Sequence, residues 1–152
     1  YGLAQYRRML MLTDEDLYRL INNDVDVVLP YPLFYEPNIN AHHERYLSTD
    51  DWTATLQALE EIQPEYFNGL DKIMNQQCLF NYNLILAKKA VLKDYCGWLF
   101  PILERVETLS RPKGKDRADR YIGYIGETLE TIYFMKNMNN LKIAYVPNRL
   151  YV

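Results

Sequence analysis

The sequence is short of the residues that mark several classes of protein. It has two cysteines, six glycines and seven prolines among 152 residues. Two isolated cysteines, Cys78 and Cys96, do not make a disulfide framework or a zinc site, and so few glycines and prolines exclude a long flexible linker. No apolar run reaches the 18 residues of a membrane span, and the start of the chain has no apolar signal region. We therefore expect a cytoplasmic protein without a transmembrane segment, and peripheral association with the inner face of the membrane stays open.

Positive charge is also scarce. Lys and Arg number 17 against 20 Asp and Glu, which gives a net charge of -3. Because phosphate neutralisation needs a surplus of basic residues on one face, we expect no nucleic-acid partner. The length predicts one domain, residues 1–152. Aromatic residues are the excess: 14 residues are tyrosine, whose flat face and polar tip suit packed cores and sugar or nucleotide pockets alike.

The hydrophobic pattern predicts a mixed α/β domain in which helices cover a small sheet. Thr13 and Ser48 are predicted N-caps of helices. The interval 31–40 is predicted to be a loop with exposed aromatics, and 111–120 a basic loop. Strands are predicted within 1–11, over 25–30, 78–87 and 141–146, and helices from 13 to 22, from 49 to 62, from 64 to 74, from 90 to 109 and from 119 to 138.

Asp24-Val25-Asp26 has the spelling of an Asp-x-Asp pair that holds a divalent metal on a donor diphosphate. In open α/β sheets, ligands bind beyond the carboxyl ends of the strands, whereas this pair precedes its strand. We therefore interpret it as a turn and strand start, and no residue is assigned as a metal ligand.

Arg7 and Arg8 follow an apolar, strand-like run, where a sheet delivers residues to a ligand crevice. Their planar guanidinium groups suit bidentate phosphate binding, although two surface arginines in ion pairs fit the spacing equally well. His42-His43-Glu44 is more typical of a polar loop or helix start than of a metal cluster. A general-base role for His43 or His42 stays open.

Two further residues are candidates. Asn83 lies beside the predicted core strand 84–87 and suits hydrogen bonds to sugar hydroxyls, but a turn or edge role is equally compatible. Glu127 is predicted to lie inside a helix, where a lone Glu is more often solvated than buried. No Ser-His-Asp or Cys-His signature, Gly-x-Gly-x-x-Gly fingerprint or Walker loop is present, so hydrolase, kinase and dehydrogenase interpretations lack support.

Six segments in chain order resemble the bacterial capsular and exopolysaccharide biosynthesis domain, long labelled as of unknown function and treated as a glycosyltransferase. Its Gly-Leu-x-His-Tyr-Arg-Arg stretch is matched by 2–8, and an Asp-led strand ending in Leu-Pro by 26–30. The other matches are a Pro-x-Tyr helix start at 64–66, an Asn-led strand ending in two lysines at 83–89, a Tyr-x-x-Trp-Leu-Phe helix at 95–103, and an Arg-x-x-Gly-x-x-x-Glu helix at 120–127. Two positions depart from this pattern: Gln5 replaces the His, and Thr128 stands where an Arg often follows the Glu.

This resemblance implies a GT-A-like nucleotide-sugar transferase fold in which a segment before residue 1 supplies the first strand. It implies transfer of a hexose from a nucleoside diphosphate sugar to a bacterial surface polysaccharide or glycoconjugate. The implied partners are a nucleotide sugar donor and a glycan acceptor; a divalent Mn²⁺ or Mg²⁺ cofactor is left open. The residues expected to bind donor or substrate are Gln5, Tyr6, Arg7, Arg8, Asn83 and Arg120, and those expected to be catalytic are Glu127 and His43.

Gln cannot act as a base or as an imidazole metal ligand, so such a role is in doubt at position 5. The alternative function is a non-catalytic accessory domain that binds glycan or protein through its tyrosine-rich loop. Tyr95 and Tyr133 are expected to pack in the core, whereas Tyr6, Tyr31 and Tyr35 are expected near the site.

Overall fold

The computed structural model describes residues 1–111 and 120–151. Within them the largest sheet has four strands in the order β1 (Gly2–Leu3), β6 (Ile85–Ala87), β3 (Val27–Pro30) and β7 (Ile143–Val146). β6 is antiparallel to β1 and β3, while β3 and β7 are parallel. All four residues of β3 are buried, as expected for a strand between two neighbours that is covered on its faces.

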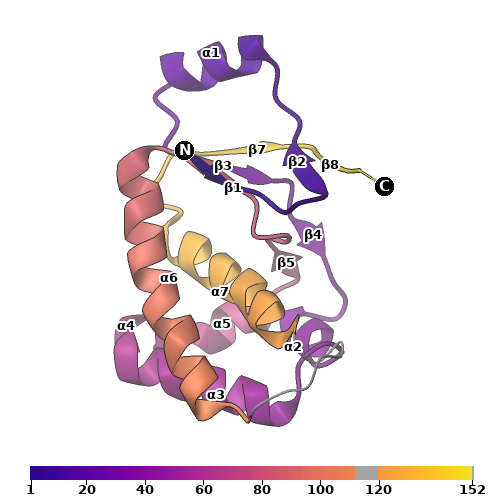
Figure 1. The fold of residues 1–152 in the computed structure, drawn as a ribbon, viewed down its shortest axis with the longest axis vertical. Helices are drawn as coiled ribbons and strands as arrows, with labels where there is room; N and C mark the ends of the chain where they lie inside the picture. The colour runs from indigo at the N-terminus through magenta and orange to yellow at the C-terminus, as the bar shows by residue number, and fades with distance from the viewer. Residues whose placement is uncertain (112–119, 152) are drawn as a thin grey trace.

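Two smaller antiparallel pairs extend this sheet. β2 (Arg8–Leu10) pairs with β8 (Asn148–Leu150), which places the start and the end of the described chain side by side. β4 (Leu33–Phe34) pairs with β5 (Cys78–Leu79) below the sheet. The β2–β8 pair carries the Arg-Arg stretch, and the β4–β5 pair leads to the helices (Figure 1).

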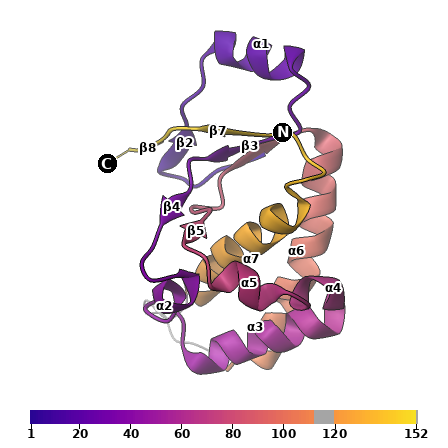
Figure 2. The ribbon, with the colours of Figure 1, turned by 180° about the vertical axis from the view of Figure 1, so that it is seen from behind.

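The helices lie mainly on one side of the sheet (Figures 1 and 2). They are α2 (Ile39–His43), α3 (Thr49–Ile62), α4 (Pro64–Phe67), α5 (Leu70–Met74), α6 (Lys89–Leu109) and α7 (Tyr121–Asn137). α7 runs through the middle of this layer, and its residues 125–134 are buried except Glu127, which is half-buried. A helix covered almost all round is typical of a core.

α1 (Asp14–Asn22) stands on the opposite side of the sheet from the other helices (Figures 1 and 2). None of its residues is buried. Its start has the predicted cap: Thr13 Oγ1 accepts from the backbone N–H of Asp16 at 3.2 Å, and Asp16 Oδ2 accepts from the N–H of Thr13 at 2.9 Å. This reciprocal capping box stabilises a helix that gains little from packing.

Aromatic residues form much of the core under the sheet. Tyr95 and Tyr133 are 1% and 8% exposed, and their rings contact each other at 5.0 Å between centroids. Trp98 and Phe134 lie within 5.0 and 5.2 Å of them, in tilted arrangements that aromatic pairs prefer. The predicted packing role of these two tyrosines is confirmed.

Most predicted elements are confirmed, but the strand predicted over 78–87 is wrong. It is divided into β5 and β6, which belong to different sheets. Tyr82 and Asn83 between them have φ of 81° and 47°, a left-handed backbone that cannot continue a strand. The expected loop at 31–40 contains β4 and the start of α2, and β8 follows the last predicted strand. Residues 112–119 of the predicted basic loop lie outside the described residues.

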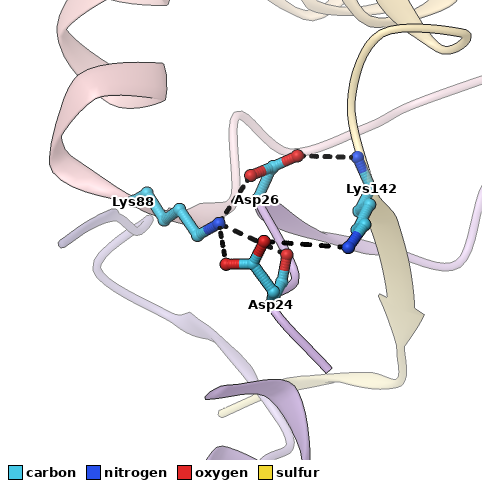
Figure 3. A network of polar contacts seen from close by, with 4 residues as sticks. All are labelled: Asp24, Asp26, Lys88 and Lys142. Carbon is cyan, nitrogen blue, oxygen red and sulfur yellow. Dashed lines mark hydrogen bonds and ion pairs between the residues drawn. The ribbon is translucent and has the colours of Figure 1, made fainter. Parts of the chain in front are cut away.

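Asp24 and Asp26 connect three segments of the sheet (Figure 3). Lys88 Nζ donates to Asp24 Oδ1 at 2.6 Å and to Asp26 Oδ1 at 2.8 Å. Asp26 Oδ2 accepts from the backbone N–H of Lys142 at 2.9 Å, and Lys142 Nζ lies 3.7 Å from Asp24 Oδ2. The pair therefore joins the start of β3 to the ends of β6 and of the α7–β7 connection.

The ionisable side chain of Glu130 lies entirely within the core. It is 0% exposed, and neither carboxyl oxygen has a hydrogen-bond partner among the described residues. Burial raises the pKa of Glu130 well above its usual range, and the nearby Glu127 adds to the rise. The backbone N–H of Asn83 faces the carboxyl and offsets part of the effect, although it lies outside hydrogen-bonding geometry. Glu130 is therefore protonated in the folded protein at neutral pH.

Glu130→Gln should become progressively more stable than the wild type as the pH rises. Unfolded Glu130 ionises above about pH 4.3 while the folded group stays neutral, so the wild type loses stability above that pH and the variant does not. Urea unfolding at pH 4.5, 6 and 7.5 should show a relative gain in unfolding free energy that increases with pH, by at most about 1.4 kcal/mol per pH unit. Glu65→Gln, at an exposed position of α4, is the control with a flat difference. If the unfolding free energies of Glu130→Gln and wild type change with pH in parallel, the assignment of a neutral Glu130 in the folded protein is wrong.

Asp26→Asn should destabilise the protein more than Asp24→Asn. The hydrogen bonds from Lys142 and Lys88 hold the pKa of Asp26 below its usual range, so its contribution is present above about pH 3.9 and lost as the pH falls through the lower folded value. We expect the substitution to lower the free energy of unfolding by about 1 kcal/mol at pH 7 after solvent screening, and this difference should shrink as the pH falls below about 3.9. Asn tolerates the positive φ of 53° at position 24, which makes Asp24→Asn a matched control. Equal effects in urea unfolding would contradict this order.

Candidate functional site

A two-residue turn between β5 and β6 organises the candidate site. Tyr82 and Asn83 both have positive φ, which is common for Asn but strained for a bulky residue such as Tyr. Such strain costs on the order of 1–3 kcal/mol and persists only where surrounding contacts hold it. The turn places the Tyr82 ring against β2 and the Tyr82 backbone N–H against α7, as the next contacts show.

Glu127 on α7 is the carboxylate that this turn faces. Burial is the largest influence on this carboxyl group, and it raises the pKa of Glu127 to about 7. The backbone N–H of Tyr82, which faces the carboxyl, and the positive charge of Arg8 act in the opposite direction, because both favour the carboxylate. The side chain is therefore poised to gain or lose a proton near neutral pH, the property expected of a general acid or base.

Arg8 supplies the positive charge beside this carboxylate. β2 pairs with β8, so that Arg8 stands opposite Leu150, and its Nη1 donates to Asn148 Oδ1 at 3.2 Å. The guanidinium carbon lies 3.7 Å from the centroid of the Tyr82 ring, a close cation–π contact. These two contacts orient the guanidinium and leave it half-buried.

Asn83 is directed at the backbone of α7. Its Nδ2 donates to the carbonyl of Gly123 at 3.3 Å. A Cβ at Gly126 would lie 3.0 Å from Asn83 Oδ1, so the glycine lets the amide approach the helix. Asn83 therefore lies next to the helical turn that carries Glu127, and one of its amide donors is already used in holding the turn there.

His42 and His43 reach Glu127 from the other side. Both line a small cavity of about 20 Å³ together with Glu127, and its remaining lining residues come from β5, α7 and the residues after α2. His43 is buried, and its Nδ1 pairs with the carbonyl of Ile39 at 3.3 Å. Burial lowers the pKa of both histidines, so both imidazoles are neutral at pH 7. The structure thus brings together His43, Glu127, Asn83 and Arg8 of the predicted residues.

The other predicted site residues stand apart from this group. Gln5, Tyr6 and Arg7 are exposed, with Tyr6 88% exposed, and the Arg7 guanidinium lies 4.9 Å from the Tyr6 ring. Arg120 is exposed at the N-terminal end of α7, one helical turn before Gly123. These side chains have no contact with Glu127 among those found in the described residues.

The tyrosines expected near the site divide into two groups. Tyr35 stacks on His42 with ring centroids 3.5 Å apart, and its hydroxyl accepts from Asn81 Nδ2 at 2.9 Å. Tyr31 is 56% exposed and, like Tyr6, presents its ring to solvent. The expectation holds for Tyr35, which is joined to the Glu127 cavity through His42.

Potential metal ligands do not cluster in the part of the chain that the structure describes. No group of three or more His, Cys, Asp or Glu side chains in residues 1–111 and 120–151 is arranged to hold a metal. Asp24 and Asp26 do not fit a metal on a diphosphate, because the network in Figure 3 occupies their oxygens with Lys88 and Lys142. Likewise, no described helix has the length and apolar character needed to cross a membrane.

Three contributors to the site were not predicted. Tyr82 links Arg8 to Glu127, Asn148 fixes Arg8, and Glu130 lies one turn beyond Glu127 in the core. A Glu-x-x-Glu spacing inside the apolar stretch 125–134 was a usable signal for Glu130, because i and i+3 share a helix face. No local signal marks Asn148, which meets Arg8 through strand pairing across 140 positions.

Comparison with solved structures shows the fold. A chain described as "WbbM bifunctional glycosytransferase apo structure" superposes with a TM-score of 0.81 at 23% identity. The match covers 99% of the present chain and 33% of that chain, so the protein described here spans one third of the length of this relative. The predicted mixed α/β, GT-A-like fold class is confirmed by this glycosyltransferase neighbour. No curated protein sequence matches significantly.

Comparison with protein families shows which family the chain belongs to. The family described as "Domain of unknown function (DUF4422)" matches residues 1–138. This range includes the strands and the helices of the candidate site up to the end of α7. The chain therefore belongs to the DUF4422 family and has a glycosyltransferase-like fold.

Proposed function

We propose that the protein transfers a hexose from a nucleoside diphosphate sugar to a bacterial surface polysaccharide or glycoconjugate, on the cytoplasmic side of the membrane. The fold shared with a glycosyltransferase supports this proposal. The observation that carries it is the meeting of Arg8 and Glu127 at Tyr82: a fixed cation lies beside a carboxyl group whose pKa is about 7.

Arg8 is the group we assign to the leaving diphosphate. A guanidinium oriented before the reaction stabilises the charge that develops on the departing phosphate oxygens without further rearrangement. Its contacts with Asn148 and Tyr82 provide this orientation. Arg7 and Arg120 are exposed, and we assign them to the outer phosphate and to substrate entry.

Glu127 is the group we assign to proton transfer. The acceptor hydroxyl gives its proton to the Glu127 carboxylate as its oxygen attacks the anomeric carbon, and the bond to the diphosphate breaks. The nearby Asn83 amide has one N–H on the Gly123 carbonyl and a second N–H for a sugar hydroxyl. His43 Nδ1 faces the Ile39 carbonyl, so Nε2 of the same ring is left as a hydrogen-bond acceptor.

A divalent metal such as Mn²⁺ or Mg²⁺ would neutralise the phosphate charge of the donor diphosphate. The Asp24–Asp26 pair does not fit this role because its oxygens are held by lysines. We therefore assign charge neutralisation at the described site to Arg8 and name no metal ligand.

The competing function is a non-catalytic module that binds a glycan through aromatic side chains. The observation in its favour is the exposure of Tyr6, Tyr31 and Phe34, at 88%, 56% and 70%. Aromatic faces of this kind stack on sugar rings. A titration that offers both nucleotides and glycans separates this module from a transferase.

Arg8→Ala should weaken the binding of nucleoside diphosphates at least about ten-fold, because one charge-assisted phosphate contact is lost. Isothermal titration calorimetry with a panel of nucleoside diphosphates measures this. Arg149→Ala is the matched control, since Arg149 lies on the neighbouring strand β8 and is exposed. Equal affinity of Arg8→Ala and wild type would remove the donor-site assignment, and binding of glycans alone would favour the module.

Glu127→Gln should lower the transfer rate by about 10²–10⁴-fold, the usual contribution of a general base. In the wild type, kcat/KM should rise about ten-fold per pH unit below pH 7 and level off above it, because the carboxylate form is the active one. Glu65→Gln, on the exposed side of α4, should keep the wild-type profile. A wild-type rate that falls as the pH rises from 6 to 8 is incompatible with Glu127 as the base.

A further inference from the structure

The cavity between α2 and α7 has the size of one water molecule. Its volume is about 20 Å³, and a water molecule needs roughly 10–15 Å³ measured in this way. Much of the lining is apolar or aromatic, including Leu47, Leu79, Tyr46 and Tyr124. A water is retained in such a place only if two or more polar atoms face it.

Two polar groups meet this requirement. The carboxyl of Glu127 lines one side. On the other side, His42 Nδ1 is buried and has no hydrogen-bond partner in the part of the chain that the structure describes. Leaving a buried nitrogen unsatisfied is unfavourable, and a bridging water would remove this cost.

The ring of His42 is held in place by its neighbours. Tyr35 stacks on one face with centroids 3.5 Å apart, and Tyr46 approaches at 5.1 Å. Tyr46 in turn contacts Tyr124 on α7 at 5.3 Å, so aromatic contacts connect α2 to the helix of Glu127. The orientation of Nδ1 therefore does not depend on the water.

We propose that His42 is a positioning residue that holds one water against Glu127. The water donates one hydrogen bond to the unprotonated Nδ1 of His42 and the other to the Glu127 carboxylate. A water molecule has two O–H donors, so one water satisfies both acceptors, His42 Nδ1 and the Glu127 carboxylate. When Glu127 gains a proton from the acceptor hydroxyl, its O–H donates to the same water and the link to His42 is kept.

The two adjacent histidines have different roles in this arrangement. His43 Nδ1 faces the Ile39 carbonyl, which can only accept, so this nitrogen carries the proton. His42 must carry its proton on Nε2 to leave Nδ1 as an acceptor. The positioning residue is thus His42, whereas His43 is fixed by Ile39 and by the ring of Trp52 at 4.3 Å.

The charged and titratable groups around the pair are known. Burial disfavours protonation of His42 most, and Arg45 and His43 from its own segment act in the same direction. Glu127 faces it from α7, and the titratable residues Tyr35, Tyr46 and Tyr124 belong to the same aromatic group. Arg8 acts on Glu127 from β2, and Glu130 lies one turn further along α7.

The histidines give a direct test, because the sequence contains only two. Long-range ¹H–¹⁵N NMR of the wild type at pH 8.5 should show opposite tautomers, with the proton on Nε2 in His42 and on Nδ1 in His43. An Nδ1–H tautomer of His42 would overturn the proposal.

A pair of substitutions tests the water itself. Asn places Oδ1 one bond from Cγ, as His places Nδ1, so His42→Asn should keep the acceptor and His42→Leu should remove it. By ¹³C NMR of the Glu carboxyl carbons, His42→Leu should raise the pKa of Glu127 by about one unit, since a hydrogen bond to the carboxylate is lost. His42→Asn should leave it near the wild-type value. Equal shifts in both variants would indicate lost stacking on Tyr35 and overturn the assignment.

The inference rests on the proposed function for its catalytic meaning, but neither NMR experiment needs a substrate. If nucleotide binding is absent but the tautomers and the effect of His42→Leu on the pKa of Glu127 are as predicted, the proposed function is wrong and the water-linked pair of His42 and Glu127 remains supported. If nucleotide binding depends on Arg8 but this effect on Glu127 is absent, the proposed function remains supported and the proposed role of His42 is wrong.

Discussion

The left-handed backbone of Tyr82 is the constraint on which the candidate site depends. Only with a positive φ does the chain leave β5 in a direction that puts the Tyr82 N–H on Glu127 while its ring lies under Arg8. A bulky residue pays for this conformation in strain, and the contacts at both ends of the residue offset it. The same turn separates β5 from β6, so one local conformation determines both the division of the sheets and the meeting of the two charged groups.

The acid–base character of the site comes from where α7 lies. A helix that runs through the middle of the helical layer carries its polar residues into a medium of low polarity, and this raises the pKa of Glu127 to about 7. Glu130 experiences the same surroundings without a compensating hydrogen bond and is neutral. The graded environment along one helix explains how two carboxyl groups three positions apart differ in charge: one borders a cavity and Arg8, and the other is enclosed by the core.

Periodicity and capping residues predict the long elements well. The helices at 49–62 and 90–109 and the strand at 25–30 follow from apolar spacing and from Ser48, because these signals are local. The turn at Tyr82 could not be predicted, since its neighbours alternate as a strand does and the conformation is imposed by α7 and β2. For the site, Arg8 and Glu127 were candidates from their positions in the sequence, and the resemblance in motif gave them their expected roles. Tyr82 and Asn148 were missed because their contacts join segments that the sequence does not mark as neighbours.

The departure at Gln5 has a physical consequence that the fold makes clear. Gln5 is exposed, and its carbonyl accepts from the backbone N–H of Arg8 at 3.2 Å in the turn before β2. This contact uses the main chain, so it forms whichever side chain stands at position 5. The placement of Arg8 then depends on the β2–β8 pairing, Asn148 and Tyr82, none of which involves the Gln5 side chain. Gln5 itself carries no titratable group, and the paired cation and carboxyl are in place without its side chain. In this chain, imidazoles reach Glu127 from α2 instead.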